Sequence, residues 1–154
     1  MIEVQAPNEY EIDDDPVIFL AGSIEMGLAE KWQDRVVKAI ADEHCLVLNP
    51  RRDDFQANAV QEASNPYFSE QVNWELDGIE VADVILFYFD PATKSPITLM
   101  ELGLMAKSFD KQLIVCCPKT FWRRGNVEIV CDRHNLTLVE TFEQMVEELR
   151  EWLS

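Results

Sequence analysis

Short runs of consecutive apolar residues alternate along this chain with segments of helical periodicity, and this alternation limits the folds open to it. Residues 17–21 read Val-Ile-Phe-Leu-Ala, and residues 84–89 are apolar or aromatic throughout. A strand that is apolar at every position is buried on both faces, as in a parallel sheet covered by helices. Similar runs at 45–48, 113–117 and 136–139 bring the number of predicted strands to five.

Amphipathic helices are predicted between these strands. Residues 28–43 place Leu28, Trp32, Val36 and Ile40 four apart, which forms one apolar helical face. Further helices are predicted over 66–80, 95–109, 123–133 and from 141 onward, with Ser95-Pro96 and the pair Thr141 and Gln144 as helix-start signals. The pattern predicts an α/β fold: a flavodoxin-like, doubly wound, five-stranded parallel sheet with helices on both faces. Residues 1–16 are expected to be a polar leader and 17–154 a single domain.

The composition excludes some partners more firmly than it names one. With 154 residues and 47% hydrophobic content, the chain can bury one sizeable core. Its formal net charge of −16 makes polymeric nucleic acid and anionic membranes poor partners, whereas a small neutral substrate is little affected. The first residues lack the basic and apolar regions of a signal peptide, so we expect a cytoplasmic protein.

The cysteines and histidines give no sign of a metal site or a redox centre. The spacing of Cys45, Cys116, Cys117 and Cys131 matches no zinc motif, so we interpret all four as reduced packing residues. The two histidines lie near predicted helix ends and pair with no nucleophile in sequence. We therefore expect neither a metal nor a cofactor.

In doubly wound sheets the ligand lies beyond the carboxyl ends of the strands. Here these ends are followed by residues 22–27, 49–55 and 90–101. The first segment contains Gly22 and Gly27 but lacks the lysine of a phosphate-binding loop, and Glu25 would repel phosphate. A turn lining a pocket for an uncharged group is the better interpretation.

Glu101 is the acidic residue least expected at its position. It lies in Leu99-Met-Glu-Leu-Gly-Leu-Met105, an apolar stretch on the second turn of a predicted helix. Burying a carboxylate there costs several kcal/mol unless other groups compensate, although a solvated position remains open. Glu75 and Asp77, on the preceding helix, are further acidic candidates that are either functional or surface charges. Two carboxylates in contact would perturb each other's pKa values, as a nucleophile and a proton donor require.

Taken together, several motifs resemble the nucleoside 2-deoxyribosyltransferase family, in particular its branch called nucleoside 2-deoxyribosyltransferase-like. The matching segments are Phe19-Leu-Ala-Gly-Ser-Ile24, Asn49-Pro-Arg-Arg-Asp-Asp54, Asn73-Trp-Glu75, Ala82-Asp-Val-Ile85, Ser95-Pro-Ile-Thr98 and Met100-Glu-Leu-Gly103. The resemblance implies that Glu101 attacks the anomeric carbon of a 2′-deoxynucleoside. A second base, or water, then resolves the resulting deoxyribosyl ester.

The resemblance also assigns expected roles to other residues. Glu75, 26 positions before Glu101, corresponds to the family's partner carboxylate, which is usually an aspartate. Asn126 corresponds to an asparagine that a neighbouring subunit contributes to the sugar hydroxyls, which implies a homo-oligomer with shared active sites. The remaining substrate-binding candidates are Phe19, Gly22 and Ser23 at the first strand, and Asp77. Ser95 stands at the position that handles the base in the family, and Asp90 or Asp54 could take over that role.

One departure from the family pattern leaves the reaction open. Transferases of the family commonly carry an aspartate six residues before the nucleophile, and this chain has Ser95 there. We therefore expect transfer of 2-deoxyribose between nucleobases, with nucleosides and free bases as ligands. The alternatives are an N-glycosidase that hydrolyses nucleosides or their monophosphates, and a non-catalytic nucleoside-binding module.

Overall fold

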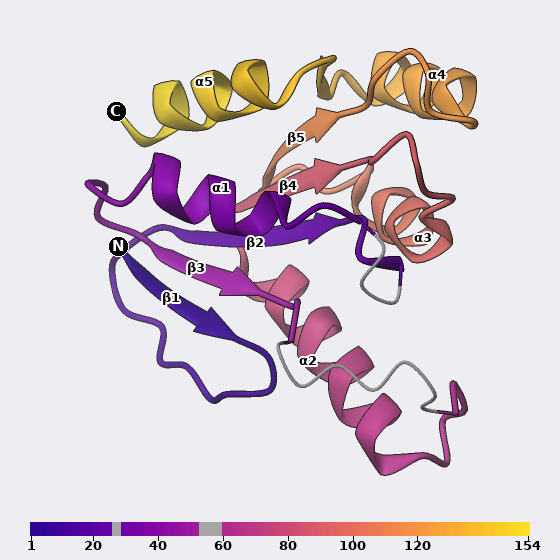
Figure 1. Ribbon diagram of the computed structural model, residues 1–154. Helices are drawn as coiled ribbons and strands as arrows, with labels where there is room; N and C mark the ends of the chain where they lie inside the picture. The colour runs from indigo at the N-terminus through magenta and orange to yellow at the C-terminus, as the bar shows by residue number, and fades with distance from the viewer. Residues whose placement is uncertain (26–28, 53–59) are drawn as a thin grey trace.

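The computed structural model describes residues 1–25, 29–52 and 60–154, which form a parallel sheet in the order β1-β3-β2-β4-β5-β6 (Figure 1). Every neighbouring pair of strands is parallel. The strands are β1 (Ile2–Gln5), β2 (Val17–Gly22), β3 (Leu46–Asn49), β4 (Val84–Tyr88), β5 (Gln112–Cys116) and β6 (Thr137–Val139). The last five confirm the five strands predicted from the apolar runs.

The predicted number of strands was wrong, because β1 lies within residues 1–16, where the sequence indicated a polar leader. This strand pairs with β3 alone, with Ile2 opposite Leu46 and Gln5 opposite Asn49. An edge strand is not buried on both faces, so it does not need the continuous apolar run that marks the inner strands. Ile2 is indeed exposed, and of this strand's residues only Val4 packs against the core.

The order of the strands fixes where a ligand would bind. Counted without β1, the order is 2-1-3-4-5, one of the common orders of doubly wound sheets. The chain reverses direction across the sheet at β2, which has β3 on one side and β4 on the other. In such sheets the ligand crevice lies at the carboxyl ends of the strands at this switch point. The strands all point to the edge where α3 begins (Figure 1).

Helices cover both faces of the sheet, as predicted. They are α1 (Trp32–Ala39), α2 (Pro66–Val81), α3 (Pro96–Met105), α4 (Arg124–His134) and α5 (Phe142–Leu153). One apolar cluster joins Ile18 and Leu20 of β2 to α1 and α5. The other joins Phe19 and Ala21 of the same strand to α2, α3 and α4. Alternating side chains of a buried strand thus serve two cores.

The cysteines follow the same alternation. Cys116 contributes to the cluster under α1 and α5, and Cys117 to the cluster under α2, α3 and α4. All four cysteines are buried free thiols. Burial raises the pKa of Cys116 and of Cys117 to about 12, which keeps both thiols protonated.

The predicted capping box is confirmed, a cap that was not predicted begins α2, and the predicted cap of α3 differs. Thr141 and Gln144 form the predicted capping box of α5. Asn65 caps α2 by accepting from the backbone N–H groups of Tyr67 and Phe68. Ser95 occupies the N-cap of α3, but its φ of 48° is left-handed and its hydroxyl makes no capping bond. That hydroxyl bonds instead to other side chains near the switch point.

Gly22 is required at the end of β2 because two other groups approach its α-carbon closely. A Cβ there would lie 2.4 Å from the Trp32 ring and 2.7 Å from the carbonyl oxygen of Tyr88. The second of these atoms belongs to the backbone of the paired strand and cannot move aside. Glycine therefore allows β2, β4 and α1 to meet at the switch point.

Candidate active site

Glu101 is a buried carboxylate on the second turn of α3, with 7% of its surface exposed. No side-chain hydrogen bond to its carboxylate is formed by the residues that the structure describes. Burial, followed by the negative charge of Glu75, raises the pKa of Glu101 to about 8. The structure thus excludes the solvated position that the sequence left open.

Glu75 faces the same region from α2. Burial raises the pKa of Glu75 to about 7, and a hydrogen bond from Gln71 opposes part of that rise. The negative charge of Glu75 acts on Glu101, so the two carboxyls belong to one electrostatic environment. With pKa values raised to about 7 and about 8, each member of this pair can hold a proton near neutral pH.

Gln71 holds Glu75 in place, one helical turn before it on α2. Its Nε2 donates to Glu75 Oε1 at 2.8 Å and to the carbonyl oxygen of Pro50 at 2.8 Å. Pro50 follows β3, so this amide links the carboxylate to the carboxyl end of a strand. The Oε1 atom of Gln71 is buried and has no hydrogen-bond partner among the described residues.

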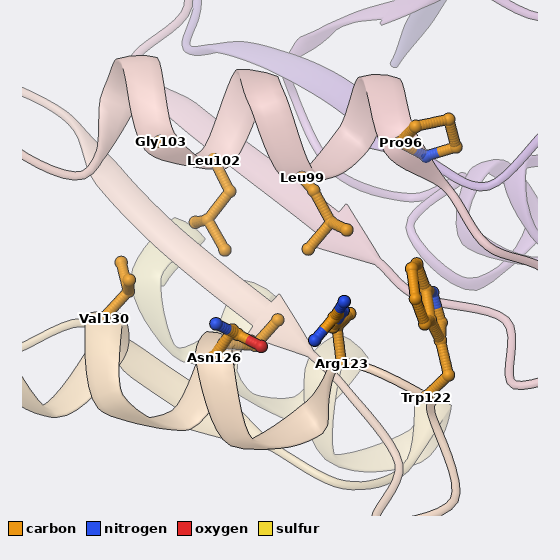
Figure 2. A pocket seen from close by; sticks show the side chains of 9 residues that line it. Pro96, Leu99, Leu102, Gly103, Trp122, Arg123, Asn126 and Val130 are labelled. Atoms are coloured by element: carbon orange, nitrogen blue, oxygen red, sulfur yellow. The ribbon is translucent and has the colours of Figure 1, made fainter.

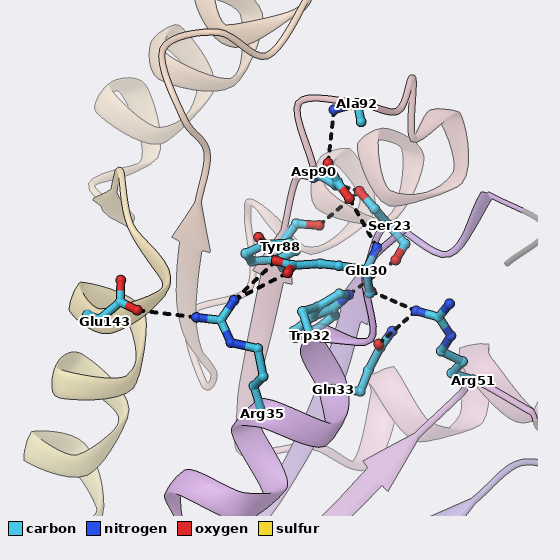
Figure 3. Close-up of polar contacts among 10 residues, drawn as sticks. All are labelled: Ser23, Glu30, Trp32, Gln33, Arg35, Arg51, Tyr88, Asp90, Ala92 and Glu143. Atoms are coloured by element: carbon cyan, nitrogen blue, oxygen red, sulfur yellow. Dashed lines mark hydrogen bonds and ion pairs between the residues drawn. The ribbon is translucent and has the colours of Figure 1, made fainter. Parts of the chain in front are cut away.

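A cluster of buried hydroxyls lies at the switch point, between the ends of β2 and β4. Ser23 and Ser95 form a short hydrogen bond, and Thr93 Oγ1 lies 2.7 Å from Ser95 Oγ. Ser23 Oγ also accepts from the backbone N–H of Asp90 at 2.9 Å (Figure 3). These contacts bring together three of the predicted site residues, Ser23, Asp90 and Ser95.

The Asp90 carboxylate organises the loop around this cluster. Its Oδ1 accepts from the backbone N–H of Ala92 at 2.9 Å, and its Oδ2 accepts from that of Glu30 at 3.2 Å (Figure 3). Glu30 in turn accepts from the Tyr88 hydroxyl and pairs with Arg35 at 3.2 Å. The loop after β2 is thereby joined to the loop after β4.

Glu25 binds the segment that leads into α3. Its Oε1 accepts from the backbone N–H groups of Lys94 at 2.8 Å and of Ser95 at 2.5 Å. Backbone N–H groups just before a helix are a common binding site for anions. In this protein a side-chain carboxylate occupies those two groups.

The structure does not bring every predicted residue to this site. Phe19 is fully buried in the core, where its ring packs against Trp74 and lies under Gly78. Asp77 is exposed on α2, and its negative charge adds to the effect of burial in raising the pKa of Tyr10. Asp54 lies outside the described residues.

Asn126 lies in a different place from Glu101, in a groove of about 440 Å³ between α3 and α4. Figure 2 shows Leu99 and Leu102 directed from α3 towards Asn126 and Arg123. Glu101 does not line this groove. Within one copy of the chain, Asn126 and Glu101 therefore face different surroundings.

Sequence reasoning missed two residues of the site, Gln71 and Thr93. Gln71 lies four residues before Glu75, so the helix predicted over 66–80 already placed the two on one face. Thr93 lies two residues before Ser95 in a loop, where no periodicity indicates direction. A search for polar residues one helical turn from each candidate carboxylate would have found the first.

The raised pKa values predict how stability depends on pH. The folded protein holds protons on Glu75 and Glu101 to higher pH than the unfolded chain does, so their stabilising contribution is full below about pH 4.5 and is lost as pH rises through 7 to 8. Glu101→Gln should therefore gain unfolding free energy over the wild type between pH 5 and pH 9, on the order of 3 kcal/mol.

Urea unfolding at several pH values measures this difference. Glu80→Gln, on the exposed side of α2, is the matched control and should show no comparable rise. A Glu101→Gln advantage that is the same at pH 5 and pH 9 would contradict the buried, protonated state of Glu101.

No group of three or more histidine, cysteine, aspartate or glutamate side chains among residues 1–25, 29–52 and 60–154 is arranged to hold a metal ion. Among the helices that the structure describes, none has the length and apolar character needed to cross a bilayer.

Comparison with known proteins places the chain in a family. A family model described as nucleoside 2-deoxyribosyltransferase like matches residues 15–121. A solved structure titled "Crystal structure of conserved protein from Enterococcus faecalis V583" aligns with a TM-score of 0.56 and 9% identity, over 90% of this chain and 99% of that chain. At that identity the likeness concerns the fold alone, and no curated protein matches. Because the family model covers more than half of its residues, the chain belongs to the nucleoside 2-deoxyribosyltransferase-like family.

Proposed function

We propose that this protein transfers 2-deoxyribose between nucleobases through an ester formed on Glu101. Family membership suggests a nucleoside-modifying enzyme. The observation that carries the proposal is Glu101 itself: a buried carboxyl, without a hydrogen-bond partner among the described residues, beside a second carboxyl. A carboxylate without such partners keeps its lone pairs for an electrophile, here the anomeric carbon of the sugar.

The reaction we propose has two displacements. In the first, a Glu101 oxygen bonds to C1′ as the bond from C1′ to the base nitrogen breaks, and the base leaves with that electron pair and a proton. In the second, a nitrogen of another base attacks C1′, loses its proton and releases Glu101. Both steps pass through oxocarbenium-like sugar character, as in retaining glycosidases.

The carboxyls of Glu75 and Glu101 are the proposed source of the proton that the leaving base needs. Ser95, where family transferases commonly have an aspartate, contributes only a hydroxyl, and this hydroxyl is bonded to Ser23 and Thr93. Glu75 and Glu101 together hold a proton near neutral pH, since the pKa values are raised to about 7 and about 8. We therefore assign Glu75 the role of passing that proton to the base.

A flavodoxin-like fold is part of the proposal, because the five strands that follow β1 in the chain have the 2-1-3-4-5 order and helices cover both faces. The substrate should be a neutral nucleoside rather than a nucleotide. The net charge of −16 disfavours phosphate, and Glu25 occupies two backbone N–H groups at the start of α3.

We also propose a homo-oligomer in which two copies share each site. In the family an asparagine of a neighbouring subunit contacts the sugar, and here Asn126 does not lie with Glu101 of its own chain. The exposed side of α3 carries Ile97, Met100 and Leu104, each more than half exposed. An apolar helix face next to the groove suits contact with a second copy.

Mixing two inactive variants tests the sharing of sites. Glu101→Ala and Asn126→Ala, co-expressed or refolded together, should recover about a quarter of the wild-type activity if the protein is a dimer, because half of the dimers are mixed and one of their two sites is intact. Each variant mixed with wild type is the control for dilution. Activity of the mixture equal to the sum of the separate variants would show that each chain completes its own site.

Base exchange tests the proposed function itself. Thymidine or deoxyinosine is incubated with a different free base, and chromatography should show a new nucleoside. Free base and deoxyribose without a new nucleoside would instead establish a hydrolase. Stabilisation of the protein by nucleosides, without any reaction, would establish a binding module.

A further inference from the structure

Gln71 is the one described residue near the carboxyl pair that has a buried polar atom without a partner. Its Oε1 is buried and accepts no hydrogen bond from the described residues. Leaving a buried carbonyl oxygen unpaired costs about 1–3 kcal/mol. Native proteins tolerate such a cost where another group completes the contact.

The amide of Gln71 cannot avoid this cost by turning over. Its nitrogen donates to two oxygens, Glu75 Oε1 and the carbonyl oxygen of Pro50, both at 2.8 Å. A flipped amide would set its own oxygen against the backbone carbonyl oxygen of Pro50, which cannot donate a hydrogen bond in any protonation state of Glu75. The two bonds therefore fix the direction of the free oxygen.

The charged side chains near Gln71 are either acidic or already paired, which favours a neutral hydrogen-bond donor for its Oε1. Glu101 of α3 and Glu75 of α2 are acidic, and the two cations that follow β3 are engaged elsewhere. Arg51 donates to the backbone carbonyls of Ala29 and Glu30, and Arg52 pairs with Glu70. A hydroxyl is a neutral donor of the right size for an amide oxygen.

We propose that Gln71 binds the substrate, its free Oε1 accepting a hydrogen bond from a sugar hydroxyl while its Nε2 holds Glu75. This inference rests on the proposed function, because a sugar whose C1′ bonds to Glu101 has its other hydroxyls within a few bonds of that carbon, and Glu75, which Gln71 holds, acts electrostatically on Glu101. One side chain would then set the position of both the sugar and the partner carboxylate. It would also favour nucleosides that retain the hydroxyl.

A cycle of ligands and variants tests this contact. Binding is measured by calorimetry in a Glu101→Gln background, so that the N-glycosidic bond survives. The ligands are a 2′-deoxynucleoside and its analogues that lack the 3′- or the 5′-hydroxyl. With Gln71 present, loss of one of these hydroxyls should weaken binding at least tenfold; with Gln71→Met, the same loss should change binding by no more than about twofold.

The cycle separates this contact from the support that Gln71 gives to Glu75. Weaker support for Glu75 affects all ligands alike and cancels in the comparison. Asn73→Ala, on the exposed side of the same helix, is the control and should leave the hydroxyl effect unchanged. Gln71→Ala serves the same cycle if Gln71→Met does not fold.

The outcomes distinguish the two proposals. Nucleosides that bind with the same hydroxyl dependence in the presence and absence of Gln71 would overturn the assignment of Gln71 and leave the proposed function intact. No nucleoside binding to the parent protein would overturn the proposed function, and the role of Gln71 with it.

Discussion

Glu101→Ala is expected to lose base exchange by a factor on the order of 10³ or more. The variant lacks the atom that bonds to C1′, and no other described carboxylate occupies the same turn of α3. The loss should fall on kcat, because the ester is formed only along the reaction path, while nucleoside binding should change much less. Initial rates of exchange at saturating nucleoside measure it, with calorimetry for binding.

Two further variants serve as comparisons for Glu101→Ala. Glu101→Gln preserves the shape of the side chain and should be as inactive as Glu101→Ala, because an amide is a poor nucleophile. Glu80→Ala, on the exposed side of α2, should keep the wild-type rate. Exchange in Glu101→Ala within tenfold of the wild type would remove Glu101 from the mechanism.

Glu75→Gln should lower the exchange rate by about 10²-fold. The amide cannot hand a proton to the leaving base, so the base must depart as an anion or take its proton from water. The same change removes the negative charge that helps to raise the pKa of Glu101 to about 8. Glu101 should therefore ionise at lower pH, and the rate profile of the variant should rise at lower pH than that of the wild type.

The dependence on the leaving base gives a second measure of the same role. Bases that leave readily without protonation should be less affected by Glu75→Gln than bases that need a proton. Glu80→Gln is the matched control on the same helix. An unchanged rate, together with an unchanged pH profile, would return Glu75 to a structural role.

The four inner strands β2, β3, β4 and β5 were predictable because each is buried on both faces and is therefore almost continuously apolar. The edge strand β6 is only partly buried and was predicted from a shorter apolar run. The edge strand β1 was not, because Ile2 and Glu3 lie where only one side of the strand has a partner. Its four residues gain their structure from pairing with β3 rather than from their own pattern. Local sequence does not record that kind of stabilisation.

The sequence also indicated the two carboxyls of the candidate site. Glu101 was notable as an acid among apolar residues, and the spacing seen in the family indicated Glu75. In the structure, burial raises the pKa of both side chains. The partners of Ser95 were not predictable. Its hydroxyl reaches Ser23, 72 residues away in sequence, and this contact depends on how β2 and β4 pair.

The direct test of the account is to look for the deoxyribosyl ester on the protein. Wild-type protein is mixed with a 2′-deoxynucleoside without an acceptor base, quenched in acid and measured by mass spectrometry, with peptide mapping of the modified residue. The peptide that contains Glu101 should carry an added mass of one deoxyribosyl group, and this added mass should be absent from Glu101→Gln. A peptide carrying the sugar on another residue, or turnover without any adduct in wild-type protein, would contradict it.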